Sequence, residues 1–243
     1  MAKDSPEIIP ANTSGEIHPK GLLDAISYID QNFANEMGGC MIKARFLTTK
    51  QRFEFMEVGA RSSFASGMIS VLLTPLAIGV VEKYIPMFGE SNPSIFDQFC
   101  AMLLAMSFSL GYAVFIAKTA TQYIGEYTKS MVRNLLGGMI GGSVLKAVLA
   151  FIAFHGIYFK VFSDQNIVWV LSKVFYTRFS METITKIYKW VQSFRGIFLT
   201  SSYFIVLSTI LFIMIPCVAY LWTWRRNEKM FDSGLVQRPR ENG

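Results

Sequence analysis

Four long apolar runs constrain this chain more than any other feature of its sequence. They cover residues 63–81, 98–117, 134–159 and 196–224, and Lys146 is the one Lys, Arg, Asp or Glu inside them. A helix rises about 1.5 Å per residue, so about 20 apolar residues cross a hydrocarbon core about 30 Å thick. We therefore expect an all-α, polytopic membrane protein with about four transmembrane helices.

The overall composition supports this class. Of the 243 residues, 52% are hydrophobic and 16% are charged, whereas an ordinary soluble domain carries about 25% charged residues. Such a composition excludes a disordered chain and argues against a soluble domain. The net charge of +6 comes from basic residues that flank the apolar runs instead of forming one cluster. This distribution is typical of membrane orientation signals, and it does not favour direct binding of nucleic acid.

The runs also divide the chain into regions. We expect a mobile N-terminal tail over 1–20, an amphipathic cytoplasmic helical region over 21–62, the transmembrane domain over 63–224 with an interfacial loop at 160–195, and a basic polar C-terminal tail over 225–243.

Two local patterns refine this division. Thr48 precedes Gln51 by three residues, which is the spacing of a capping box and predicts that a helix begins there. In the loop 160–195, apolar residues recur at helical spacing on both sides of Ser180, and Trp169 and Trp190 are of the type enriched at membrane interfaces. The loop is therefore predicted to form two amphipathic helices that meet near Ser180.

The basic residues predict an orientation. With both termini cytoplasmic, thirteen Lys and Arg residues near the spans face the cytoplasm and seven face the other side. The positive-inside rule favours this arrangement in a plasma membrane or a bacterial inner membrane, although the loop 160–195 carries six of the seven outer basic residues.

The third run begins with closely spaced glycines. Gly137 and Gly141 are four residues apart, as are Gly138 and Gly142, and small residues at this spacing let two membrane helices approach closely. The glycines could pack against the first or second span, where residues 65–67 offer a matching small surface, or form a subunit interface, or serve as a hinge.

Lys146 lies near the middle of the third run, where a charged side chain costs about 2.5–3.5 kcal/mol on insertion scales. It could be a structural lysine satisfied by carbonyls or by a partner subunit, it could line a pore, or it could lie nearer the interface than the run suggests. His155 follows nine residues later, on nearly the opposite side of an ideal helix, and we expect a structural role for it.

Pro75 and Pro216 lie inside the first and fourth runs. A proline removes one backbone hydrogen bond, but transmembrane helices tolerate it because neighbouring groups satisfy the freed carbonyl. Each is therefore predicted to kink its span without ending it.

Catalytic and metal-binding patterns are lacking in the sequence. Cys40, Cys100 and Cys217 are widely spaced, and with two histidines in the chain they form no zinc motif. Ser143 and Lys146 share one helix face, but no oxyanion site or substrate access accompanies them. We expect no enzyme activity, no metal and no cofactor.

These observations lead to a functional hypothesis. The chain is predicted to be a non-enzymatic integral membrane subunit of a multiprotein membrane assembly, of the secretion, DNA-transfer or defence type. The alternative is a homo-oligomeric channel or pore lined by the third span, with Lys146 and small residues of that span facing water. His155 is a second candidate for the pore lining. The chain's partners would be membrane lipids together with other proteins or further copies of the chain.

Overall fold

The computed structural model describes residues 19–37, 47–84, 95–125, 128–176 and 178–233, and all regular structure among them is helical. The long helices are α2 (Thr49–Tyr84), α3 (Ile95–Thr119), α4 (Lys129–Gly156) and α6 (Met181–Asp232). The shorter elements are α1 (Leu22–Met37), the 3₁₀ turn η1 (Thr121–Tyr123), the π-helical turns η2 (Ile157–Val161) and η3 (Leu171–Phe175), and α5 (Asp164–Val170). The predicted all-α class is confirmed for the part of the chain that the structure describes.

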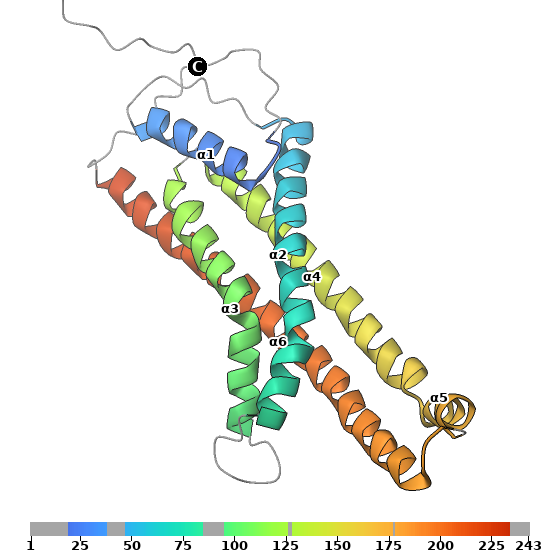
Figure 1. The fold of residues 1–243 in the computed structure, drawn as a ribbon. Helices are drawn as coiled ribbons and strands as arrows, with labels where there is room; N and C mark the ends of the chain where they lie inside the picture. Colours follow the sequence, from blue (N-terminus) through green and yellow to red (C-terminus); the bar gives the residue numbers. More distant parts are fainter. Residues whose placement is uncertain (1–18, 38–46, 85–94, 126–127, 177, 234–243) are drawn as a thin grey trace, which may run out of the picture.

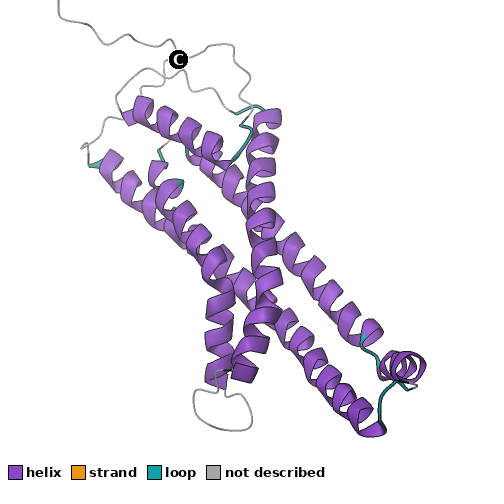
Figure 2. Ribbon diagram, in the orientation of Figure 1, coloured by secondary structure: helices purple, strands orange, loops and turns teal. Residues whose placement is uncertain are grey.

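The long helices form an elongated bundle. Figure 1 shows α1 lying across one end of the bundle and α5 lying at the opposite end. The purely helical character of the bundle is visible in Figure 2. Helix α2 has its most extensive contacts with α4 and further contacts with α3, while α6 packs on α4 and α3.

Three helical stretches are long and apolar enough to cross a membrane: Thr49–Val80, Lys129–Val161 and Met181–Met230. This finding supports a membrane protein. In the most apolar window of the third stretch only 22% of the residues are buried inside the protein, so most of that helix presents its side chains to the surroundings.

Two helices extend well beyond the apolar runs they contain. Helix α2 begins in the predicted cytoplasmic region and passes residue 62 without a break, and α6 includes both the second amphipathic pattern of the loop 160–195 and the whole fourth run. Helix α6 also extends into the predicted C-terminal tail. Charged and polar side chains do not interrupt the backbone hydrogen bonds of a helix, so a helix can continue where an apolar run stops. The predicted tail 1–20, apart from its last two residues, lies outside the described residues, as do residues 234–243.

The helix starts follow the local sequence. Thr48 and Gln51 form the predicted capping box, because the Gln51 backbone N–H donates to Thr48 Oγ1 at 3.3 Å and the Thr48 N–H donates to Gln51 Oε1 at 3.0 Å. Ser180 accepts a hydrogen bond from the Thr183 N–H at 3.4 Å at the start of α6. Such caps satisfy backbone donors that have no partner within the helix.

Both helices that contain an internal proline continue through it. Pro75 lies inside α2 and Pro216 inside α6. Next to Pro75, the Thr74 hydroxyl donates a hydrogen bond to the carbonyl of Ser70 at 2.7 Å, so a side chain as well as the backbone bonds to the carbonyls of this turn.

The interior is divided along the bundle. Near α1, a large apolar cluster joins Ile29 of α1 to residues of the long helices, including Phe55, Ile116, Leu135 and Phe212. Towards α5, a smaller cluster contains Val71, Ala150, Phe154 and Ile205. Buried polar side chains of α2, α4 and α6 lie along the same interior, and they provide the candidate site.

Candidate functional site

The contact between α2 and α4 depends on glycines. A methyl group added at Gly138 would overlap the backbone of Met56, one at Gly142 would overlap Ala60 and Ser63, and one at Gly59 would overlap the carbonyl of Leu135. Residue numbers rise together along the two helices, so α2 and α4 run parallel. Helices that associate in this way gain van der Waals contact because their backbones touch.

The four glycines of the third run therefore separate into two pairs. Gly138 and Gly142 face α2, whereas a Cβ at Gly137 or Gly141 would meet no atom within 4 Å. Gly141 is exposed and Gly137 is partly exposed. One face of α4 is thus occupied within the chain, and the face that carries Gly137 and Gly141 is open.

On α2 the matching surface is longer than the sequence analysis expected. It includes Gly59, Ala60, Ser63 and Gly67, and Gly67, which belongs to the expected residues 65–67, lies against Lys146 of α4. The spacing of Gly59, Ser63 and Gly67 at four-residue intervals was the available signal. It begins before Arg61 and hence outside the first charge-free run.

Lys146 is enclosed between helices of its own chain. Its side chain is 3% exposed, and its aliphatic stem lies against Gly67, where a methyl group would overlap the Lys146 Cδ. Its Nζ lies 5.9 Å from the ring centroid of Phe212 on α6, within the range of a cation–π contact. Gly67 therefore provides the space that the lysine stem fills.

Buried hydroxyls accompany Lys146 in the interior of the bundle. They are Ser63, Ser66, Ser70 and Thr74 on α2, Ser143 on α4, and Ser201, Ser202, Ser208 and Thr209 on α6. Several of them donate to carbonyls of their own helices, as Ser66 does to Ser63 at 3.2 Å and Ser208 does to Ile205 at 2.8 Å. A hydroxyl that donates in this way keeps lone pairs that can accept from an ammonium.

No carboxylate pairs with Lys146 among the residues that the structure describes. Ion pairs in that part of the chain include Arg61–Glu57, Lys186–Glu182 and Arg195–Asp164. Ser143 Oγ is buried and has no hydrogen-bond partner in that part of the chain, so Ser143 and Lys146 do not form the hydrogen bond that a catalytic dyad needs.

His155 lies in a different environment. Its Nδ1 is 3.0 Å from the carbonyl oxygen of Phe151, and its ring meets that of Tyr203 edge-on with 6.0 Å between centroids. The structure does not bring His155 and Lys146 together.

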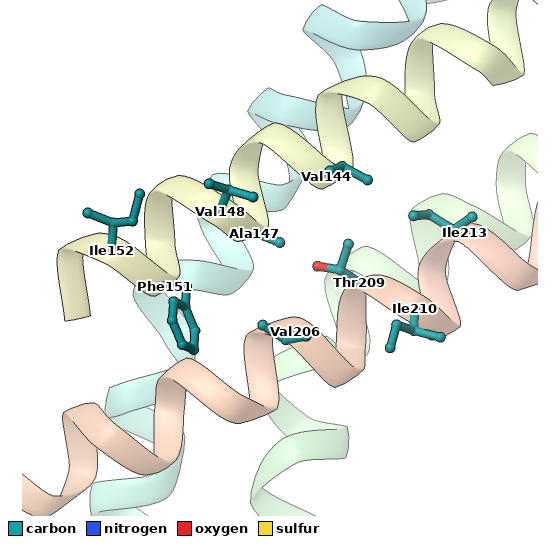
Figure 3. Close-up of a pocket in the computed structure, with 9 residues that line it drawn as sticks. All are labelled: Val144, Ala147, Val148, Phe151, Ile152, Val206, Thr209, Ile210 and Ile213. Atoms are coloured by element: carbon teal, nitrogen blue, oxygen red, sulfur yellow. The ribbon is translucent and has the colours of Figure 1, made fainter. Parts of the chain in front are cut away.

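A groove opens between α4 and α6 on the outside of the bundle. Figure 3 shows its lining: Val144, Ala147, Val148, Phe151, Ile152, Val206, Thr209, Ile210 and Ile213. Its volume is about 410 Å³, and Thr209 is its one polar residue.

A polar cluster fastens α5 to the first turns of α6. Asp164 Oδ1 accepts hydrogen bonds from Gln192 Nε2 and, at 3.2 Å, from Arg195 Nη1. The Arg195 guanidinium also lies 4.3 Å from the ring centroid of Tyr158. These contacts hold the segment after α4 against the next membrane helix.

No three His, Cys, Asp or Glu side chains come close enough to hold a metal ion within the described ranges. Comparisons with protein families, characterised proteins and solved structures find no significant match.

Proposed function

We propose that this chain is a non-enzymatic integral membrane subunit of a multiprotein membrane assembly, inserted through four spans. The spans are parts of α2, α3, α4 and α6. Helix α3 has 25 residues and is about 37 Å long, which exceeds the hydrocarbon core of about 30 Å. An even number of crossings agrees with the arrangement in Figure 1, in which α1 and the C-terminal end of α6 lie at the same end of the bundle.

The orientation in the proposal has both termini at the cytoplasmic face of a plasma membrane or a bacterial inner membrane. The excess of Lys and Arg on that side of the spans supports it.

One observation carries the proposal: α4 has a second small-residue face that its own chain leaves open. Gly138 and Gly142 are used within the chain, while Gly137 and Gly141 border empty space. Because lipid gives apolar helices no hydrophobic reason to associate, small residues that permit close contact are the usual basis for adding another membrane helix. We assign this open face to a helix of a partner subunit.

The pore alternative has less support. It requires Lys146 to face a water-filled channel between copies of α4, but this lysine lies among α2, α4 and α6 of a single chain. A charge enclosed in that way does not line an inter-subunit channel.

The test is the native mass of the tagged full-length protein after gentle extraction with its surrounding lipid. The proposal predicts a stoichiometric foreign subunit that is retained by the wild type and lost from Gly141→Leu. Gly111→Leu is the matched control, because Gly111 is an exposed glycine of α3 with no atom within 4 Å of its added Cβ. A closed homo-oligomer alone, or a partner retained equally by both variants, would contradict the proposal.

A further inference from the structure

The groove between α4 and α6 has the character of a hydrocarbon site. Its walls are Val144, Val148 and Ile152 on one side and Val206, Ile210 and Ile213 on the other (Figure 3). The hydroxyl of Thr209 donates to the carbonyl of Ile205 at 2.8 Å, so it offers no free donor to an occupant. A single hydroxyl that can only accept gives too few polar partners to hold an ordered water.

The depth of the groove matches one leaflet of a bilayer. Val144 is two residues from Lys146, which lies near the middle of the third apolar run. The groove lining on α4 runs from Val144 to Ile152, a rise of about 12 Å, and His155 lies about 16 Å from Val144, close to half of the hydrocarbon thickness of about 30 Å. The groove therefore begins near the middle of the membrane and ends about one turn short of the level of His155 on the α5 side. A partner helix that crossed the whole membrane would therefore contact the groove along only about half of the partner helix.

The outer end of the groove is polar. One turn beyond Ile152 and Val206 lie His155 and Tyr203, whose rings meet edge-on at 6.0 Å between centroids. Tyr203 is exposed and His155 is partly exposed. Aromatic rings with a polar tip are favoured at the level of lipid head groups.

The segment that follows is basic. Residues 160–195 contain six Lys and Arg and two acidic residues, Asp164 and Glu182. Both acids are engaged, with Arg195 at 3.2 Å and with Lys186 at 2.7 Å. Lys160, Lys173 and Lys189 are exposed and form no ion pair within the described residues. A surplus of exposed ammonium groups at this level attracts anionic head groups.

We infer that the groove holds one acyl chain of an anionic phospholipid from the leaflet on the α5 side. The head group lies at the His155 and Tyr203 end, beside the basic segment 160–195. The inference requires insertion in a membrane, but it does not require a partner subunit. The lipid site lies on the part of α4 that follows Gly141 and leads towards α5, whereas the proposed partner contact lies at Gly137 and Gly141.

The experiment is native mass spectrometry of the full-length protein in mild detergent, titrated with phosphatidylglycerol or with phosphatidylcholine of the same acyl chains. The wild type is expected to bind one phosphatidylglycerol at least tenfold more tightly than phosphatidylcholine. Val148→Trp fills the groove and is expected to weaken this binding at least tenfold. Leu149→Trp is the matched control, since Val148 and Leu149 are neighbours at one depth, are both 49% exposed, and only Val148 lines the groove.

Two further variants test the same groove, so that the conclusion does not depend on Val148→Trp alone. Ile210→Trp fills the groove from α6 and should act like Val148→Trp, while the double variant His155→Gln, Lys160→Gln should reduce the preference for phosphatidylglycerol without abolishing lipid binding. Equal binding of the two lipids by the wild type, or equal effects of Val148→Trp and Leu149→Trp in proteins that remain monodisperse, would overturn the inference. A lipid-bound protein that lacks any foreign subunit would contradict the proposed function alone.

Discussion

Gly141 and Gly142 are adjacent in the chain and have opposite surroundings. Gly142 touches the backbone of α2, whereas Gly141 faces open space. The Cα–Cβ directions of successive residues in a helix differ by about 100° around the helix axis, so adjacent residues can lie on a packed face and on a free face. Two overlapping small-residue motifs with identical spacing therefore differ in their surroundings, and the spacing alone does not distinguish them.

This difference predicts the effect of the smallest substitution. Gly142→Ala should lower the free energy of unfolding by about 1–3 kcal/mol, because its methyl group would overlap Ala60 and Ser63 of α2. Gly141→Ala should leave it unchanged or raise it by up to about 1 kcal/mol, since alanine is the better helix former and its methyl group meets nothing. Reversible unfolding in detergent micelles measures both. Equal losses in the two variants would show that α2 and α4 do not pack as described.

Among the elements, α6 is distinguished by its unbroken length. Helix α6 has 52 residues and is about 78 Å long, more than twice the thickness of the hydrocarbon core. It joins a polar segment next to α5 to a membrane span. The contacts of Asp164 with Gln192 and Arg195 determine where α5 lies on this helix.

Removing that contact should release α5. In Asp164→Ala the mostly buried Arg195 loses its carboxylate, and an interaction of this kind is worth about 1–3 kcal/mol. We expect amide hydrogen exchange across 164–175 to accelerate at least fivefold, while exchange in α2 stays unchanged. Glu182→Ala is the control because it removes an exposed pair with Lys186 within one helix, which contributes little. If both variants left exchange unaltered, Asp164 would not anchor α5.

The elements also show what could be predicted from the sequence. The apolar runs predicted helices, and Thr48 with Gln51 predicted the start of α2, because both are local signals. The helix expected after Ser180 begins at Met181 as predicted, but it continues through the fourth run instead of ending near residue 195. The boundary expected near residue 62 lies inside α2. Those expectations followed the distribution of charge, whereas a helix ends where its backbone hydrogen bonds end. The surface of α2 that receives Gly138 and Gly142 was predicted only in part, because the pattern of Gly59, Ser63 and Gly67 extends across the charged Arg61.

For the whole molecule, the position of Lys146 favours the subunit proposal over the pore alternative. The sequence identified the lysine as costly but could not state which helices surround it. In the structure its stem fills the space beside Gly67, and its ammonium faces Phe212. The interior charge thus belongs to the fold of one chain, and we propose that the outer face of α4 binds partners and lipid.

The most direct measurement of this arrangement is the accessibility of position 146 to water in native membranes. A Lys146→Cys variant, made in a chain in which Cys40, Cys100 and Cys217 are replaced by serine, is treated with a charged, membrane-impermeant maleimide applied to both faces of the membrane. Lys189→Cys serves as the exposed control. Our account predicts rapid labelling of position 189 and labelling of position 146 at least a hundredfold slower until the protein is denatured. Labelling of position 146 at a rate close to that of position 189 would mean that Lys146 lines a water-filled pore, and it would contradict the account.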